Sequence, residues 1–251
     1  MTAAESDFTY TTVDNTAMVT GYTGSETELV IPDTLGGYTV TSIGNRALWQ
    51  NQTFVSVTIP ETVTSIEEYA FWKCTALETV SIPGGVTKIG NSVFKDCSKL
   101  ANITLPKNLI EIGEGVFENC TALTEIELPK SLVTMPNKQL FKNSGLTSVS
   151  FEDGTEIVAE NILSQCSKLQ SVTLPESVRE IGVSAFWGCT ELTEVRIPDG
   201  VTKIGSSAFA QCIGLTTITI SRSVTAIAET AIDYSYLATK LTIRGVRGTY
   251  A

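Results

Sequence analysis

Residues 77–99 read LETVSIPGGVTKIGNSVFKDCSK, and close variants of this 23-residue stretch fill most of the chain. Residues 79–82 alternate between polar and apolar side chains, which is typical of a strand with one buried face. Pro83 lacks an N–H group and ends that strand, and the two glycines after it supply a turn. The apolar residues in 86–89 predict a second short extended piece. The apolar spacing in 91–97 predicts one or two turns of helix.

The six cysteines show the period of the sequence most clearly. They are Cys74, Cys97, Cys120, Cys166, Cys189 and Cys212, and the successive intervals are 23, 23, 46, 23 and 23 residues. Asn143 occupies the vacant slot in the long interval, and columns of proline, leucine and phenylalanine keep the same phase. A period of this length predicts a stack of coils in which each coil contacts only its neighbours.

A lone coil of this length cannot bury its apolar side chains, so stacking on neighbours must close its open ends. We therefore expect an α+β repeat solenoid, with a parallel β-sheet on one face and short helices or turns on the other. Residues 1–30 are expected to form an N-terminal capping segment. Residues 31–237 hold one imperfect unit and eight 23-residue units, and residues 238–251 begin a C-terminal cap. The units at 123–145 and 146–168 depart from the pattern, so the middle of the array is expected to bend or loosen.

The consensus Leu-x-x-Val-x-Ile-Pro-x-x-Val-x-x-Ile-Gly-x-x-Ala-Phe-x-x-Cys-x-x resembles the BspA-like branch of the leucine-rich repeats over about residues 31–237. The segment from Phe8 resembles the family's N-terminal cap. The segment from Leu241 resembles the start of its C-terminal cap, so we expect the chain to be a piece of a longer protein. The resemblance implies a right-handed superhelix, and a secreted or cell-surface protein of bacteria or some protists that is linked to adhesion or host-protein binding.

Composition excludes several classes of function. The chain has 27 acidic and 17 basic residues, and its net charge of -10 argues against a nucleic-acid groove. Because the chain has no histidine, it has no Ser-His-Asp triad, no imidazole base and no His-ligated zinc. No apolar run is long enough to span a bilayer. The first seven residues lack a signal-peptide pattern, so either the protein is cytosolic or a leader has been removed. We expect no enzyme activity and no cofactor.

The cysteine column has three interpretations. Stacked coils place the cysteines within disulfide range, but parallel stacking aims their Cβ atoms in the same direction. A ladder of metal ligands is the second possibility, although the chain has no Cys-x-x-Cys pair. Free thiols that pack as small apolar groups are the third, and the flanking core positions favour it.

Two rows of outward-facing residues on the strands form the candidate binding face. One row is Ser56, Thr79, Asn102, Glu125, Ser148, Ser171, Glu194 and Thr217. The other is Thr58, Ser81, Thr104, Glu127, Ser150, Thr173, Arg196 and Thr219. Eleven of these sixteen are Ser or Thr, which also suit any solvated sheet. The candidate ligand contacts on this face are therefore Asn102 and the four charged residues of the two rows, Glu125, Glu127, Glu194 and Arg196.

Aromatic residues form a further column, at Trp49, Trp72, Phe141 and Trp187, next to the core phenylalanines. An exposed aromatic edge would suit contacts with proteins or sugars. Alternatively, each ring covers the gap between adjacent coils. Trp72 and Trp187 are the candidate ligand contacts in this column.

Two hypotheses for function follow. The first is a non-catalytic protein-binding or adhesion module of a secreted or cell-surface protein, which binds through the open sheet face; the candidate partners are a host or matrix protein and a glycan. We expect it to act as a monomer without nucleic acid. The second is a structural spacer that presents another domain at the cell surface. Reversing the charges of the four charged face residues separates the two, because a spacer would keep its activity in a cell-attachment assay.

Overall fold

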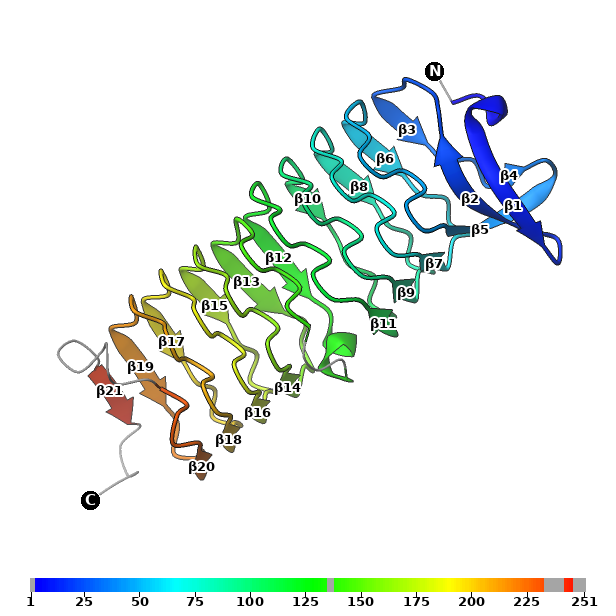
Figure 1. The fold of residues 1–251 in the computed structure, drawn as a ribbon. Helices are drawn as coiled ribbons and strands as arrows, with labels where there is room; N and C mark the ends of the chain where they lie inside the picture. Colours follow the sequence, from blue (N-terminus) through cyan, green and yellow to red (C-terminus); the bar gives the residue numbers. More distant parts are fainter. Residues whose placement is uncertain (1–2, 135–137, 233–241, 246–251) are drawn as a thin grey trace. The chain divides into compact units, whose positions relative to one another are not determined.

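The computed structural model describes residues 3–134, 138–232 and 242–245 (Figure 1). The chain divides into two compact units, Met1–Leu123 and Thr124–Ala251. In the residues that the structure describes, both are β-solenoids with parallel sheets and essentially no helix, and these residues together make about nine turns of chain. The predicted repeat solenoid is therefore confirmed, with turns in place of helices on the back of the coils.

Unit 1 begins with an antiparallel hairpin and continues as coils. Its elements are η1 (Glu5–Asp7), β1 (Phe8–Val13), β2 (Thr16–Tyr22), β3 (Glu28–Val30), β4 (Thr34–Leu35), β5 (Tyr38–Ile43), β6 (Ser56–Thr58), β7 (Ser65–Ile66), β8 (Thr79–Ser81), β9 (Lys88–Ile89), β10 (Asn102–Ile103) and β11 (Glu111–Ile112). Strands β3, β6, β8 and β10 form one parallel sheet, and β5, β7, β9 and β11 form a second. Strand β2 pairs with both β1 and β5, so the hairpin covers the first edge of the second sheet (Figure 1).

Unit 2 repeats the same plan. Its elements are β12 (Glu125–Leu128), η2 (Lys130–Thr134), β13 (Ser148–Phe151), β14 (Ile157–Val158), β15 (Ser171–Thr173), β16 (Glu180–Ile181), β17 (Glu194–Arg196), β18 (Lys203–Ile204), β19 (Thr217–Ile220), β20 (Ala226–Ile227) and β21 (Thr242–Gly245). Strands β14, β16, β18 and β20 form one continuous parallel sheet. The other face is divided, since β12, β13 and β15 form one sheet and β17, β19 and β21 form another. The extended pieces predicted after each proline correspond to the shorter strands.

The back of each coil consists of turns, whereas the sequence predicted one or two turns of helix at Asn91–Cys97. Ser92 and Asp96 have φ angles of 54° and 63°, so they end any helix within one turn. Positive φ recurs in these two phases, at Arg46, Gln50, Tyr69, Lys73, Gly115, Asn119, Asn161, Gln165, Ser184, Gly188, Ser207 and Gln211. This geometry directs N–H groups along the stack: the amide of Ser92 donates to the carbonyl of Glu114 in the next coil at 2.9 Å. Hydrogen bonds between coils replace those within a helix.

Close approach of the coils explains the Ile-Gly pair in the consensus. A Cβ atom on Gly113 would lie 2.3 Å from the backbone nitrogen of Asn91 in the preceding coil. A side chain of any size at that position would force the two coils apart, because the contact is with backbone. Glycine is therefore selected at this phase by packing between coils.

The core is built from columns of identical side chains that stack from coil to coil. In unit 1, the rings of Phe71, Phe94 and Phe117 are fully buried and nearly parallel, with centroids 5.2 and 5.7 Å apart. In unit 2, Phe186 and Phe209 stack at 5.2 Å. The leucines and cysteines of the consensus are buried beside them. Each ring thus buries the face of its neighbour, which is the stacking that the repeat requires.

One coil of unit 2 runs a residue out of phase. The thiol of Cys166 donates to the carbonyl oxygen of Phe141 at 3.5 Å, as the thiol of Cys212 does to that of Phe186. Phe141 is fully buried and takes the core place that the spacing assigns to Leu140. The prediction that Phe141 lies in the aromatic column with the tryptophans is therefore wrong.

The same shift changes which residue replaces the missing cysteine. Asn143 has a φ of 56°, and its backbone N–H donates to the backbone carbonyl of Gln165, so it is a turn residue. Ser144, which is buried, takes the cysteine position that the spacing gave to Asn143. Pro129 keeps the phase of the other prolines, so the extra residue enters between Pro129 and the core position. Leu146 is again in phase, and the shift is confined to this coil.

The boundaries of the predicted caps remain a prediction. Most of the segment expected to begin a C-terminal cap, residues 238–251, lies outside the described residues; only β21 (Thr242–Gly245) is described, and it pairs in parallel with β19. The hairpin of β1 and β2 lies within the segment expected to form the N-terminal cap, residues 1–30.

Candidate functional site

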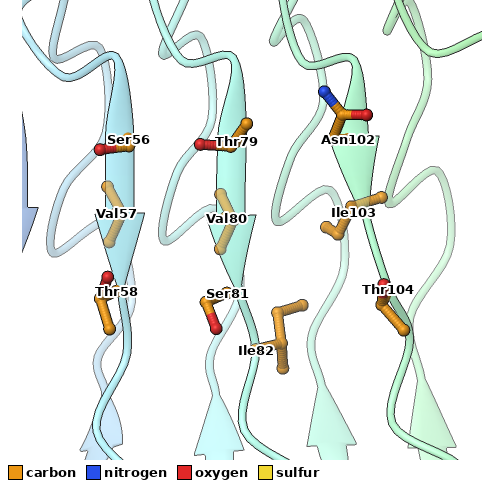
Figure 2. A pocket seen from close by; sticks show the side chains of 10 residues that line it. All are labelled: Ser56, Val57, Thr58, Thr79, Val80, Ser81, Ile82, Asn102, Ile103 and Thr104. Carbon is orange, nitrogen blue, oxygen red and sulfur yellow. The ribbon is translucent and has the colours of Figure 1, made fainter.

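An open depression lies on the outer face of the sheet formed by β6, β8 and β10 (Figure 2). Its volume is about 320 Å³. Its polar lining, which we call the hydroxyl face, consists of Ser56, Thr58, Thr79, Ser81, Asn102 and Thr104. Figure 2 shows these residues in two parallel rows, one strand apart at each step.

Strand alternation places the hydroxyl face outward. Val57 and Val80 lie between the two rows and turn inward, where they are 1% and 5% exposed. The strands are in register, since Thr79 pairs with both Ser56 and Asn102. Like residues on neighbouring strands therefore stand side by side, and donors and acceptors repeat across the sheet. This confirms the predicted two-row arrangement in unit 1, in which Asn102 is the exposed residue of β10.

Glu125 and Glu127 lie on β12 in unit 2, and both are exposed. The residues that alternate with them, Ile126 and Leu128, are buried. Glu125 pairs in register with Ser148 of β13, so both carboxylates stand on the outer face next to small hydroxyl residues. The pair gives the sheet of β12, β13 and β15 a local negative charge.

Glu194 and Arg196 lie exposed on β17, in the other sheet of unit 2. The structure therefore does not bring these two residues into one sheet with Glu125 and Glu127. Arg196 pairs with Glu176, with 2.7 Å between Nη1 and Oε1. The Arg196 hydrogen bond lowers the pKa of Glu176, and the same bond raises the pKa of Arg196. Both side chains are largely exposed, so this ion pair adds little stability.

A second cluster lies on the back of unit 1, and we call it the aromatic edge: Arg46, Trp49, Tyr69, Trp72 and Lys73. The rings of Trp49 and Trp72 are 6° from parallel with centroids 6.0 Å apart, and Tyr69 meets Trp72 edge-on at 5.9 Å. The Arg46 guanidinium lies 5.3 Å from the centroid of Tyr69 and 5.8 Å from that of Trp49. The Lys73 ammonium lies 4.6 Å from the centroid of Trp72. These are cation–π distances.

The two tryptophans of this edge differ in exposure. Trp49 is 44% exposed, whereas Trp72 is half-buried and donates from Nε1 to Asp96 Oδ2 at 3.1 Å. Trp72 therefore covers the gap beside its coil and supports the exposed ring of Trp49, while its role as a ligand contact stays a prediction. Trp187, in the same phase in unit 2, is half-buried.

All six cysteines are free and buried, so the disulfide interpretation is wrong. Each thiol donates to a backbone carbonyl in the preceding coil, with S···O distances of 3.1–3.5 Å: Cys74 to Leu48, Cys97 to Phe71, Cys120 to Phe94, Cys166 to Phe141, Cys189 to Leu163 and Cys212 to Phe186. Burial raises the pKa of Cys166 and of Cys212 to about 12. A thiol with such a pKa is protonated near neutral pH and is a poor nucleophile.

The described residues contain no group of three or more side chains suited to a metal ion. They also contain no helix that is long and apolar enough to cross a membrane. The surface thus consists of an open hydroxyl face, acidic and ion-paired strands, and an aromatic edge.

The family model for the BspA-type leucine-rich repeat region matches residues 22–139 and 134–245. The chain belongs to this family. The likeness predicted from the consensus is therefore confirmed, and the BspA-type repeat accounts for the period, the parallel sheets and the stacked core.

Solved structures of other leucine-rich repeat proteins share the fold. A leucine-rich repeat protein of T. pallidum is 28% identical, with a TM-score of 0.68, and the match covers 76% of this chain and 91% of that one. A protein from Bacteroides ovatus is 23% identical with a TM-score of 0.59, and the match covers 96% and 78%. A further match, to a leucine-rich cell surface protein from Faecalibacterium prausnitzii, is 24% identical and covers 98% and 94% of the two chains, but its TM-score of 0.41 is too low to show a shared fold. No curated protein matches the chain in sequence.

Sequence reasoning missed two contacts around the candidate residues of this BspA-type chain. Glu176 follows Pro175 at the end of one strand, and its place in the repeat gave no indication that Arg196 would reach it. Arg46 lies one period before Tyr69, and this spacing could have placed it on the aromatic edge.

Proposed function

We propose that this chain is a non-catalytic binding module of a secreted or cell-surface protein, which contacts a host or matrix protein through its open sheet face. The observation that carries the proposal is the hydroxyl face, a depression of about 320 Å³ with polar side chains on three successive strands. The BspA-type family includes bacterial cell-surface proteins and is generally non-catalytic, which supports both the location and the absence of turnover.

The hydroxyl face suits an extended partner segment. A segment that crosses β6, β8 and β10 meets a hydroxyl or amide group on each strand, and these groups both donate and accept hydrogen bonds. The face contains no aromatic residue, and large side chains usually dominate interface energies. We therefore infer a broad contact made of many weak hydrogen bonds, in which the affinity comes from the number of bonds along the partner segment.

The acidic pair in unit 2 adds a charge preference. Glu125 and Glu127 stand exposed on one strand, whereas the charge of Arg196 is matched by Glu176. A partner segment with lysine or arginine residues would be attracted to the acidic pair, and added salt would weaken that attraction. We infer that the partner of the sheet of β12, β13 and β15 is basic.

Attachment to immobilised extracellular matrix proteins tests the proposal. Thr79→Arg places a long charged side chain in the middle of the hydroxyl face and is expected to abolish attachment. Asn108→Arg adds the same side chain at an exposed turn of unit 1 and serves as the control. Reversing the charges of Glu125, Glu127, Glu194 and Arg196 is expected to weaken attachment at low salt. Unchanged attachment of both face variants, at unchanged melting temperatures, would contradict binding through the sheet.

The second candidate function is a structural spacer that presents another domain. The small Ser and Thr side chains that fill most of the two rows favour it, because they also suit a plain solvated sheet. If the solenoid is a spacer, attachment depends on the domain that it presents. Attachment would then be unchanged in both face variants and would be lost when the solenoid is shortened. The same assay therefore separates the two functions.

A further inference from the structure

The aromatic edge of unit 1 has an open end at Trp49. Trp72 stacks against one side of this ring, with planes 6° apart. On the N-terminal side the chain forms the hairpin of β1 and β2 instead of another coil, so no further ring of the column follows. Trp49 is consequently 44% exposed, although a large indole gains stability from burial.

A pocket of about 410 Å³ lies at this open end. Arg46, Trp49 and Asn51 line it from the first coil, and Thr9 and Thr20 line it from the hairpin. The pocket therefore combines the exposed ring of Trp49 and the half-buried ring of Tyr22 with hydroxyl, amide and guanidinium groups. Pockets of this size with a few converging polar groups are of the kind that holds small ligands.

The polar groups of the pocket are held in place. Asn51 Oδ1 accepts hydrogen bonds from the amide and hydroxyl of Thr53, both at 2.8 Å, and from the amide of Phe54 at 3.1 Å. These bonds fix the side-chain amide, so its NH₂ group faces away from the turn as an oriented donor. Arg46 is held by its cation–π contacts with Trp49 and Tyr69. Neither group needs to be ordered when a ligand binds, which lowers the cost of binding.

We propose that this pocket binds a pyranose ring of a glycan. One face of a pyranose carries mostly C–H groups, which pack on an indole, and its rim carries hydroxyl groups. Trp49 receives that face as the next member of the stack. Asn51 and Arg46 donate to the rim hydroxyls. The Thr20 hydroxyl donates to Thr9 Oγ1 at 3.1 Å, which leaves the Thr9 O–H to donate to a rim hydroxyl and the Thr20 oxygen to accept from one.

The chemistry of the lining favours a sugar over an aromatic side chain of a protein. A phenyl ring would stack on Trp49 equally well, but it would remove water from Asn51, Arg46 and the threonines without replacing their hydrogen bonds. Leaving such groups unpaired costs more than the added stacking gains. A hydroxyl-rich ring satisfies them. This glycan site is separate from the sheet-face proposal and stands or fails independently of it.

Titration of the whole chain with defined probes tests the site, with saturation-transfer NMR as the readout. The probes are chitohexaose, which is neutral, a hyaluronan hexasaccharide, which carries carboxylates, and N-acetyltyrosinamide, which is the aromatic alternative. Trp49→Ala is expected to weaken sugar binding by about tenfold or more, and Arg46→Met, which keeps the stem and removes the donors, by several-fold. Tyr38→Ala removes an exposed aromatic ring of unit 1 that does not line the pocket, and it should leave binding unchanged.

Binding of either hexasaccharide that depends on Trp49 and Arg46 supports the proposal. A steep loss of affinity with salt for hyaluronan alone would identify an acidic sugar as the preferred ligand. Failure of both hexasaccharides to bind, binding that survives Trp49→Ala, or binding of N-acetyltyrosinamide alone would each overturn the proposal. Melting temperatures of the variants show whether a loss of binding comes from unfolding, and Trp49→Phe, which keeps an aromatic ring, should retain part of the affinity.

Discussion

The thiol of Cys97 donates a hydrogen bond to the backbone carbonyl of Phe71, 26 residues earlier, with an S···O distance of 3.1 Å. Phe71 O also accepts from the amide of Cys74 within its own coil, at 3.2 Å. The two donors occupy both acceptor positions of one buried oxygen. The cysteine column thus joins each coil to the one before it, in addition to filling space in the core.

Removing one of these thiols should weaken the stack modestly. We expect Cys97→Ala to lower the free energy of unfolding by about 1–2 kcal/mol, because it removes a weak hydrogen bond and leaves a small cavity. Ser98→Ala, at the half-buried neighbouring position, should change stability by less than about 0.5 kcal/mol. Urea titrations followed by circular dichroism measure both. Equal losses for the two variants would contradict a structural role for the thiol.

Restoring the missing member of the column should have the opposite effect. The hydroxyl of Ser144 is buried beside Cys166 but makes no hydrogen bond of ordinary geometry to any residue that the structure describes. A thiol is less costly to bury than an unpaired hydroxyl, so Ser144→Cys is expected to stabilise the chain by about 1 kcal/mol. Asn143→Cys, at the position that simple spacing selects, should not. A gain from Asn143→Cys would show that the coil is in phase after all.

The phenylalanine column should be the most sensitive part of the core. Phe94 is fully buried between Phe71 and Phe117, so Phe94→Ala opens a cavity in unit 1 that extends over adjacent coils. The expected loss is about 3–5 kcal/mol of unfolding free energy, measured by thermal or urea unfolding. Phe94→Leu keeps most of the volume and should cost clearly less. A loss below about 1 kcal/mol for Phe94→Ala would contradict the conclusion that the stacked phenylalanines stabilise the core.

The left-handed turn residues offer sites where glycine should stabilise. Ser92 has a φ of 54°, and its equivalent in the next coil is Gly115 at 62°. Ser92→Gly relieves left-handed strain and is expected to gain about 0.5–1 kcal/mol after the entropy that glycine loses on folding. Gly115→Ala should lose about 1 kcal/mol, since its Cβ would also lie 3.2 Å from Glu118. Thermal unfolding of the two variants measures both effects. A loss of stability in Ser92→Gly together with a gain in Gly115→Ala would contradict the turn geometry.

The buried thiols give the chain an alkaline limit. Burial raises the pKa of Cys166 and Cys212 from 9.0 to about 12 in the folded state. Between these pH values the unfolded chain has lost thiol protons that the folded chain retains. Stability is therefore highest below pH 9 and falls above it, by about 1.4 kcal/mol per pH unit for each such thiol. Cys166→Ala should flatten this decline between pH 9 and 11 in urea titrations, and an identical slope would contradict the assignment.

Much of this fold could be predicted from the sequence because one unit specifies its own coil. The alternation at Thr79–Ile82, ended by Pro83, predicted both the strand and its outer face, and the cysteine spacing predicted which strands are neighbours. The back of the coil could not be predicted in this way. Serine and aspartate at positions 92 and 96 do not by themselves predict a left-handed backbone. Gly115 and Asn119, which occupy the same two phases in the next coil, are residue types that often adopt it.

The candidate site was predicted only in outline. Exposure of Glu125, Glu127 and Asn102 followed from strand alternation, which is a local property. The ion pair of Arg196 and Glu176 depends on how strand β17 lies beside a turn of the preceding coil, and no local sequence pattern predicts that. The one-residue shift at Phe141 was hidden because Leu140 is also apolar and the leucine column is back in phase at Leu146.

Thiol accessibility tests the stacked, sealed core most directly. Native protein treated with a thiol-reactive chromogenic reagent at neutral pH should show no rapid reaction at any of the six cysteines, and all six should react at once after unfolding in urea. Rapid modification of even one internal cysteine such as Cys97 or Cys120 in the folded protein, at a rate close to that of the unfolded chain, would contradict a core closed by neighbouring coils.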